Sequence, residues 1–227
     1  NTGTWRLKGH ATGDFWRWVS SWASVASSPA DLGDYETDLS LPRLTENECL
    51  VDGPEHEMTD SLFGEIELSA TGIRKSKKES LSARVAKCEE LASGDDFAIV
   101  WCDTNDESSA LASIHGAVEV RGDMTTEAKE KAILGFSRGD VRVLVTKPSI
   151  AGFGMNWQHC NNVIFAGANY SFERYYQAVR RCWRFGQKRP VTSSVVMTPN
   201  ERLIWMKTRE KAERHDEMHR EIRRWAA

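Results

Sequence analysis

The sequence predicts an α/β fold in which helices cover both faces of a parallel β-sheet. From residue 80 onward, apolar runs of strand length alternate with segments of helical periodicity. A run such as Phe97-Ala-Ile-Val-Trp-Cys102 is apolar at every position, which is typical of a strand buried on both faces. The segments between such runs have the length of crossover helices, roughly 10–15 residues.

One helix and two irregular segments are expected in the first 80 residues. Aromatic residues at i, i+3 and i+7 predict an amphipathic helix over 14–27, and we interpret this stripe as core (Phe15, Trp18, Trp22). Residues 29–54 are acidic, turn-rich and sparsely periodic, which indicates a linker. Residues 69–80 are polar and basic, and we expect a loop that leads into a helix.

Helices and strands are expected to alternate over the rest of the chain. The predicted strands are 97–102, 117–120, 142–147, 162–166 and 194–197. The predicted helices are 81–92, 105–115, 126–137, 171–185 and 200–225. Thr125 or Thr126 is the expected cap of the third helix, and Gly139 is expected to close it.

The carboxyl ends of the predicted strands form the expected functional edge, because parallel sheets bind ligands there. Thr104 and Arg121 follow two of these strands and are candidate contacts to a sugar-phosphate backbone. Their alternative roles are a helix N-cap for Thr104 and an ion pair with a neighbouring acid for Arg121. Gly152 and Gly154 follow a third strand, where glycine lets the backbone approach a ligand closely or simply form a turn. Asn156 adds an amide group to that turn.

Cysteine and histidine spacing predicts neither a disulfide framework nor a metal site. The five cysteines are odd in number and widely spaced, with no CxxC pair, which favours a reducing, cytoplasmic compartment. His215 and His219 have helical ligand spacing, but no third ligand is in view, and we interpret them as part of a solvated helix face. No apolar run approaches the ~18 residues of a membrane span.

Charge is distributed unevenly along the chain. The whole chain has a formal net charge of −3. Residues 138–191 contain 9 Lys/Arg and 2 Asp/Glu, a net charge of +7, whereas residues 1–60 contain 4 and 11, a net charge of −7. A basic block inside an acidic chain indicates a local phosphate-facing surface rather than a general polyanion-binding coat.

The basic block contains the most informative segment, Gln177-Ala-Val-Arg-Arg181-Cys-Trp-Arg184-Phe-Gly-Gln187. Within the predicted helix 171–185, the spacing places Gln177, Arg181 and Arg184 on one face. Two guanidinium groups suit a phosphate, because each has a rigid fork of donors and never loses its charge. The alternative interpretation is an ordinary solvated basic helix.

The sequence lacks the GxxxxGK[ST] phosphate loop of P-loop nucleotidases, and no DExx acid pair is placed at the end of a predicted strand. We therefore expect this chain to supply arginines to a nucleotide that another segment holds. The chain opens at Asn1 rather than Met, and we expect it to be part of a longer polypeptide.

These motifs resemble, in order and spacing, the C-terminal RecA-like lobe of superfamily 2 helicases and translocases, and most nearly the Swi/Snf-like proteins of phages and prophages. Gln177-x-x-x-Arg181-x-x-Arg184-x-Gly-Gln187 resembles motif VI, and Ala151-Gly-Phe-Gly-Met-Asn156 resembles motif V. Phe97–Cys102 resembles the motif IV strand. The resemblance implies that residues 1–60 are the end of an N-terminal lobe with its connector, and that residues 61–227 are the helicase C-terminal RecA-like domain.

The resemblance also implies a catalytic role for Arg181 and Arg184, which would reach the γ-phosphate of ATP held with Mg²⁺ by the N-terminal lobe. Gln177 would align the two arginines, while Gly152, Gly154 and Asn156 would line the cleft. Partners would be that N-terminal lobe and DNA or RNA, in a bacterial or phage-infected cytosol. The usual Ser-Thr-Arg-Ala before the glycines is replaced by Lys147-Pro-Ser-Ile150, so Lys147 and Ser149 become the candidate nucleic-acid contacts.

Two other functions remain open on the residues alone. The first is a nucleic-acid-binding module without a nucleotide role, in which the basic block binds phosphates directly. The second is a transferase that binds a sugar nucleotide or a methyl donor on a Rossmann-like sheet. The second predicts a glycine-rich turn after the first strand, where this chain has Asp103-Thr-Asn105.

Overall fold

The computed structural model describes residues 8–26, 40–53, 70–151, 154–169 and 171–225. They divide into two compact units, which are treated separately below. The sheet unit comprises Leu41–Thr208, and the helical unit comprises Asn1–Ser40 with Arg209–Ala227.

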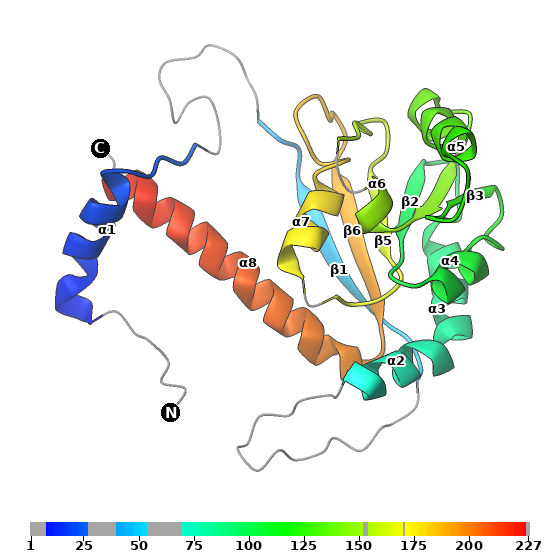
Figure 1. The fold of residues 1–227 in the computed structure, drawn as a ribbon, viewed down its shortest axis with the longest axis horizontal. Coiled ribbons are helices and arrows are strands. Elements are labelled where there is room, and N and C mark those ends of the chain that lie inside the picture. The colour runs from blue at the N-terminus through cyan, green and yellow to red at the C-terminus, as the bar shows by residue number, and fades with distance from the viewer. Residues whose placement is uncertain (1–7, 27–39, 54–69, 152–153, 170, 226–227) are drawn as a thin grey trace. The chain divides into compact units, whose positions relative to one another are not determined.

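The sheet unit is built on six strands in the order β1-β6-β5-β2-β4-β3, and every neighbouring pair is parallel (Figure 1). The strands are β1 (Leu44–Leu50), β2 (Ala98–Trp101), β3 (Ala117–Val120), β4 (Val143–Thr146), β5 (Asn162–Phe165) and β6 (Val191–Met197). The predicted parallel α/β fold is therefore confirmed. The five predicted strands are all present as β2 to β6.

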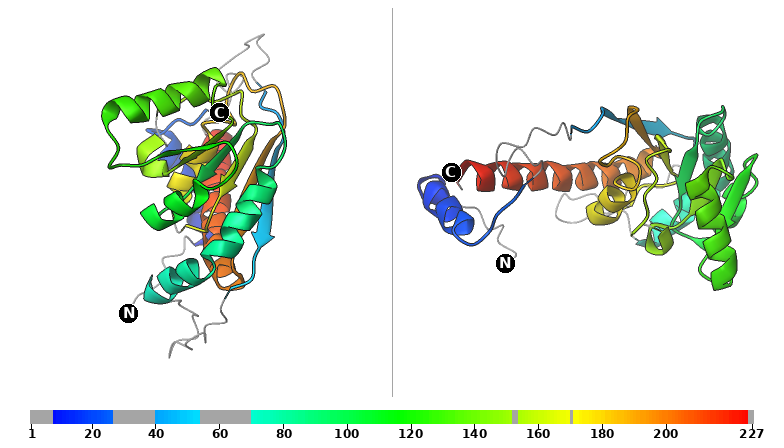
Figure 2. Two further views of the ribbon diagram at one scale, coloured as in Figure 1. Left: turned by 90° about the vertical axis from the view of Figure 1, so that its right-hand side faces the viewer. Right: turned by 90° about the horizontal axis from the view of Figure 1, so that it is seen from above.

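Helices cover both faces of this sheet, as Figure 2 shows from the side. The helices of the sheet unit are α2 (Ala70–Glu79), α3 (Leu81–Leu91), α4 (Asn105–Leu111), α5 (Thr126–Arg138), α6 (Pro148–Ala151), α7 (Phe172–Val179) and the start of α8 (Pro199–Trp225). Side chains alternate along β2: Ala98 and Val100 belong to a core cluster with residues of α3 and α4, while Ile99 and Trp101 belong to another with residues of α5 to α8. Burial on both faces explains why these strands are continuously apolar.

Two segments differ from the sequence-based expectation. Residues 44–50, expected to lie in a linker, form the edge strand β1, which pairs with β6 along its whole length. Its glutamates, Glu46 and Glu48, are both exposed at the edge, so the strand lacks an apolar signature. Residues 70–79, expected as a loop, form helix α2, because tertiary contacts of its buried face stabilise a segment whose composition is polar.

Local capping signals agree with the structure around α5. The Thr125 side chain accepts a hydrogen bond from the Ala128 amide, and the helix ends at Gly139 with φ of +87°. Positive φ is the left-handed conformation that glycine adopts without steric cost, so the predicted helix stop is confirmed.

The helical unit contains a 3₁₀ turn, Gly9–Ala11, the helix α1 (Thr12–Ser20) and the carboxyl-terminal part of α8. Val19 of α1 is buried, and the guanidinium of Arg17 lies 4.9 Å from the Trp225 ring centroid. The core interpretation of the aromatic stripe is wrong, because Trp18 and Trp22 are 60% and 65% exposed and Phe15 is 37% exposed. The helix also ends at Ser20, and residue 27 lies outside the described residues.

No helix within the described ranges is long and apolar enough to cross a membrane. All five cysteines are free thiols, and four of them are buried.

Candidate functional site: the arginine loop

The arginine loop, residues 180–187, begins where α7 ends. The helix was expected to continue to residue 185, and this boundary is wrong, because α7 ends at Val179. Beyond it, the amides of Arg181 and Cys182 donate to carbonyls three residues back, which tightens the chain into turns. The Arg181 carbonyl instead accepts from the Trp157 amide at 2.9 Å, a tertiary bond that a continued α-helix would not allow.

The three side chains singled out in the sequence nevertheless converge. Arg181 donates through Nη2 to Oε1 of Gln177 at 3.0 Å and through Nε to the Gln177 carbonyl at 3.0 Å. Nη1 of Arg181 and Nη1 of Arg184 both donate to the carbonyl oxygen of Met155, at 3.4 and 3.3 Å. Two guanidinium groups therefore share a single neutral acceptor.

Electrostatics make this arrangement unfavourable without an anion. Among the described residues, no carboxylate forms an ion pair with Arg181 or Arg184. The Nε of Arg184 is buried and makes no hydrogen bond in this part of the chain. Burial, and then repulsion from Arg184, lower the pKa of Arg181 from its ordinary value. The pair thus has unused positive charge and an unused donor, which suits an anion such as phosphate.

Buried hydrogen bonds hold the loop in place. Nε2 of Gln187 donates to the carbonyls of Cys160 and Cys182, at 2.9 and 3.4 Å, and its Oε1 accepts from the Arg189 amide. Cys182 is fully buried in the core. The structural role of Gln187 was not predicted from the sequence; its position three residues after Arg184 in the motif was the available signal.

The arginine loop does not lie at the carboxyl edge of the sheet, which was the expected functional edge. Its backbone partner Trp157 precedes β5, and β6 begins only four residues after Gln187 at Val191. A crossover helix runs antiparallel to the strands, so residues at its end lie toward the amino ends of the strands. Arg181 and Arg184 follow the end of the crossover helix α7, so they lie toward the amino ends of the strands.

The glycine turn contributes the acceptor of the arginine pair. Gly154 has φ of +77°, is exposed, and has open space where a Cβ would stand, while Asn156 is also exposed. Met155 between them provides the shared carbonyl. Gly152 lies outside the described residues.

At the carboxyl edge the structure gives the candidate polar groups internal partners. Thr104 and Glu107 form a capping box at the start of α4, and Nζ of Lys147 donates to Asn105 Oδ1 at 2.6 Å. Arg121 pairs with Asp123 at 3.2 Å and Glu119 at 3.6 Å, the alternative weighed for it. Ser149 is exposed on the short helix α6.

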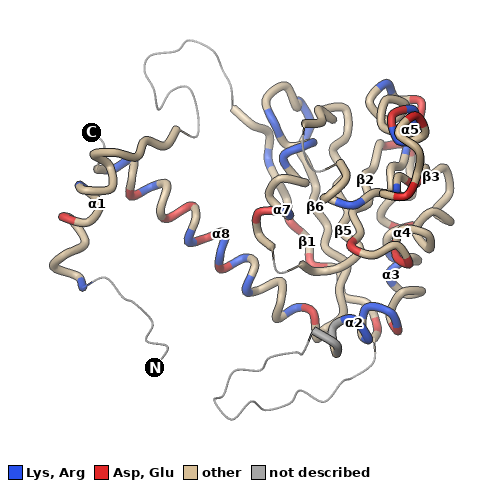
Figure 3. Tube along the Cα trace, viewed as in Figure 1, with Lys and Arg blue, Asp and Glu red and all other residues tan. Residues whose placement is uncertain are grey.

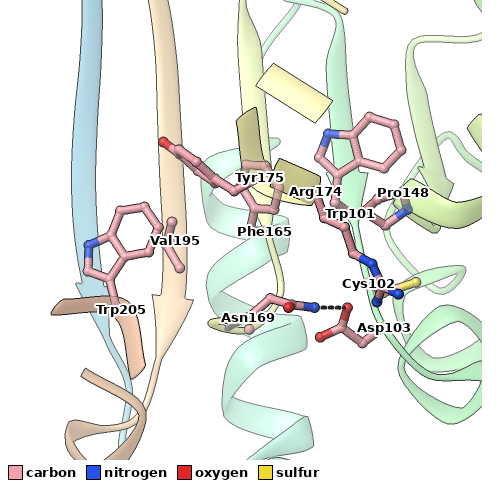
Figure 4. Close-up of a pocket in the computed structure, with 11 residues that line it drawn as sticks. Trp101, Cys102, Asp103, Pro148, Phe165, Asn169, Arg174, Tyr175, Val195 and Trp205 are labelled. Carbon is pink, nitrogen blue, oxygen red and sulfur yellow. Dashed lines mark hydrogen bonds between the residues drawn. The ribbon is translucent and has the colours of Figure 1, made fainter. Parts of the chain in front are cut away.

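A small pocket lies at this edge between the ends of β2 and β5 (Figure 4). Asp103, which follows β2, accepts from Asn169 Nδ2 at 2.8 Å across the pocket, and aromatic rings form much of the remaining lining (Trp101, Phe165, Tyr175, Trp205). The two Asp-Glu pairs of the described residues, at 106–107 and 216–217, lie inside α4 and α8 rather than at a strand end. No described group of three or more His, Cys, Asp or Glu side chains could hold a metal ion.

Comparisons with known proteins agree with this architecture. Residues 82–186, just under half of the chain, match the family described as helicase conserved C-terminal domain. No curated protein matches the sequence.

Solved structures share the fold at low sequence identity. The C-terminal part of the Fun30 ATPase domain is 17% identical with a TM-score of 0.50, over 60% of this chain and 50% of that one. A DEAD box protein from the hyperthermophile Methanococcus jannaschii is 20% identical with a TM-score of 0.52, over 58% and 37%. The C-terminal domain of the DEAD-box protein Dbp5 is 16% identical with a TM-score of 0.52, over 75% and 84%. The chain therefore spans half or less of the first two structures.

The family match covers β2 to β5, α7 and the arginine loop almost to its end, and the solved structures share the surrounding parallel sheet. Residues 82–186 therefore match the helicase conserved C-terminal domain family, and the sheet unit has a RecA-like α/β fold similar to that of solved helicase C-terminal domains.

Proposed function

We propose that this chain is the C-terminal lobe of an ATP-dependent nucleic-acid translocase or helicase, and that Arg181 and Arg184 act on ATP bound by a separate N-terminal lobe. The observation that carries the proposal is the arginine pair, which has two converging guanidinium groups and no described carboxylate partner. Positive charge on Arg181 and Arg184 that no described carboxylate neutralises is available to stabilise the negative charge of a phosphoryl group during its transfer.

The division of labour follows from the residues present. ATP and Mg²⁺ would be held mainly by the phosphate loop and acid pair of the other lobe, since this sequence has no GxxxxGK[ST] loop. Gln177, hydrogen-bonded to Arg181, fixes the orientation of that guanidinium. Gly154 and Asn156 lie on either side of the Met155 carbonyl and would line the same cleft. Lys147 and Ser149 would contact the nucleic-acid backbone at the opposite, carboxyl edge.

The test is a turnover measurement on a full-length protein that carries both lobes. Arg181→Ala and Arg184→Ala should each lower the rate of DNA-stimulated ATP hydrolysis by about 10³–10⁵, the range for an arginine that stabilises phosphoryl transfer. DNA affinity should change little. Gln177→Ala, which removes only the aligning side chain, should cost less than either arginine.

Two outcomes would contradict the proposal. Loss of DNA binding without loss of turnover would reassign the arginines to nucleic acid and favour a binding module without a nucleotide role. DNA-stimulated hydrolysis by this chain alone, abolished by Arg184→Ala, would contradict the division of the site between two lobes.

Finer assignments also belong to this proposal. The motif spacing supports a Swi/Snf-like protein of phage or prophage type, with DNA as the preferred track, acting in the cytosol of a bacterial or phage-infected cell. A sequence containing the N-terminal lobe would test it directly, since it should carry the phosphate loop and a DExx pair.

A further inference from the structure

Helix α2 is fixed across the carboxyl edge of the sheet by its buried face. The Ser76 hydroxyl lies 3.3 Å from that of Thr198, which follows β6, and Nζ of Lys77 donates to Asp103, which follows β2, at 2.8 Å. Directly after α2, Ser80 bonds to Arg84, which donates to the carbonyl of Ala166 beyond β5. The helix therefore lies beside the ends of three strands.

The opposite face of α2 presents positive charge to solvent. Arg74, Lys75 and Lys78 are all exposed, and Figure 3 shows the cluster of basic positions along this helix. Lys75 makes one loose ion pair with Glu79 at 3.9 Å. Arg74 and Lys78 form no ion pair with any described residue.

Asp103, an acid of the edge that contacts α2, is already neutralised. Asp103 accepts from both Lys77 and Asn169, at 2.8 Å each, so its two oxygens are used inside the protein. Burial alone would lower the pKa of Lys77, but attraction to Asp103, Glu107 and Glu201 outweighs it and raises the pKa, which keeps this lysine charged. Lys77 and Asp103 thus cancel, and the charge of the exposed residues remains.

We propose that the exposed face of α2, with Arg74 and Lys78 at its centre, binds the phosphate backbone of a nucleic-acid strand that crosses the carboxyl edge. The inference rests on the proposed function only in taking nucleic acid as the partner of this edge. It adds a contact surface separate from Lys147, Ser149, Arg121 and Thr104. Arg74 and Lys78 are one helical turn apart, so their side chains project from the same face at about 5–6 Å spacing and can contact neighbouring phosphates.

A nucleic-acid strand fits this surface better than a lipid headgroup layer. The exposed cations are confined to one turn of one helix, a spacing that suits neighbouring phosphates of a single strand. Contacts made only to phosphates have no sequence preference. This suits a translocase, which must release and re-form its contacts as it moves along a nucleic-acid strand.

The experiment measures the salt dependence of binding by the whole chain. A fluorescent DNA duplex is titrated between 50 and 200 mM salt with wild type, with Arg74→Gln/Lys78→Gln, and with Lys131→Gln/Arg138→Gln. The third protein is the matched control, because it loses the same two charge types from exposed positions of α5. Thermal unfolding of all three checks that each variant folds.

Each lost phosphate contact should reduce the slope of log K against log salt by ~0.9. If the α2 variant loses two phosphate contacts, its slope is smaller by about 1.8. Between 50 and 200 mM salt, the DNA affinity of wild type should therefore fall about 12-fold more than that of the α2 variant. The control should keep the wild-type slope. An unchanged slope in the α2 variant, or an equal reduction in the control, would overturn the proposal.

Two further arms separate the possible failures. Vesicles containing an anionic lipid should not bind the wild-type chain more tightly than DNA does; if they do, the partner of α2 is a membrane and the proposal is wrong. Arg181→Ala/Arg184→Ala should leave the DNA slope unchanged, so a fault in the assignment of the arginine loop would appear there and not in the α2 arm.

Discussion

The carboxyl edge and the arginine loop use charge in opposite ways. At the edge, charged groups are mostly paired: Lys77 with Asp103, Arg121 with Asp123, and the fully buried Arg84 with Glu201. In the arginine loop, two guanidinium groups share one carbonyl oxygen and have no described acid beside them. The same residue type therefore stabilises the fold in one region and is left available for a ligand in the other.

Energetics explain why the difference matters. A buried charge without a partner costs several kcal/mol, so a stable fold pairs it, as it pairs Arg84. A partly exposed arginine can remain without an acid at modest cost, because water screens it until a ligand arrives. Substitutions in the two regions should consequently affect different measurements.

The largest effect on stability is expected at the Arg84–Glu201 pair. Glu201 also accepts from the Thr198 amide at 3.0 Å, and both members of the pair are 0% exposed. Glu201→Ala should lower the free energy of unfolding by about 3–5 kcal/mol, because it leaves a buried guanidinium unpaired. Urea unfolding measures this loss.

The matched control is Glu48→Ala, which breaks the exposed pair between Glu48 and Arg202 of the same helix. Its cost should be at most about 1 kcal/mol. If Glu201→Ala and Glu48→Ala lost similar stability, the buried Arg84–Glu201 pair would not stabilise the fold more than an exposed ion pair does.

The capping box of α4 should give the next largest effect. Thr104 accepts from the Glu107 amide at 3.2 Å, and Thr104→Ala should cost about 1 kcal/mol of stability. Thr104→Ser keeps the hydroxyl and should cost much less. A DNA affinity that drops in the alanine variant while stability stays constant would instead assign Thr104 to nucleic acid, as first considered from the sequence.

His159 provides a pH-dependent comparison close to the arginine loop. Its Nε2 is buried without a described partner, and its ring lies 4.9 Å from that of Phe97 and 5.0 Å from that of Phe136. Burial lowers the pKa of His159 and outweighs the hydrogen bond that its ring donates to the Phe136 backbone, which acts to raise the pKa. The unfolded chain therefore binds this proton first as pH falls.

Stability from His159 should be fully present above its unfolded pKa of about 6.5 and should decline as pH falls toward the lower folded value. His159→Phe, which fills the aromatic site without titrating, should lose less unfolding temperature between pH 7.5 and 5.5 than wild type. Equal losses in both proteins would show that His159 does not titrate in this window.

The smallest effect on stability is expected in the arginine loop itself. Arg184→Ala removes one hydrogen bond and one like-charge repulsion, which nearly cancel, so unfolding should shift by no more than about 0.5 kcal/mol. A loss of 2 kcal/mol or more would mean that Arg184 supports the fold as Arg84 does. The contrast between the two regions would then fail.

Sequence patterns predicted the strands better than the site. Continuously apolar runs such as Phe97–Cys102 identify the central strands, because burial on both faces requires apolar residues on both. β1 escaped detection because its edge position tolerates Glu46 and Glu48. Helix α2 escaped because its helical state depends on distant partners of Ser76 and Lys77, which local composition does not encode.

For the candidate site, the sequence predicted three side chains that the structure brings together, but it predicted the wrong backbone geometry. The i, i+4 spacing brought Gln177 and Arg181 together correctly. The contribution of the Met155 carbonyl, and the end of α7 at Val179, depend on a tertiary hydrogen bond to Trp157. Such a bond joins segments more than 20 residues apart and leaves no periodic trace in the sequence.

The most direct measurement of the central claim is a titration of this chain with tripolyphosphate, followed by nitrogen NMR of the arginine Nε–H groups. If the arginine pair binds phosphate, the resonances of Arg181 and Arg184 should shift with a common affinity, and Arg184→Ala should weaken the binding seen at Arg181. Unshifted resonances of both residues, at concentrations that saturate binding elsewhere on the chain, would contradict it.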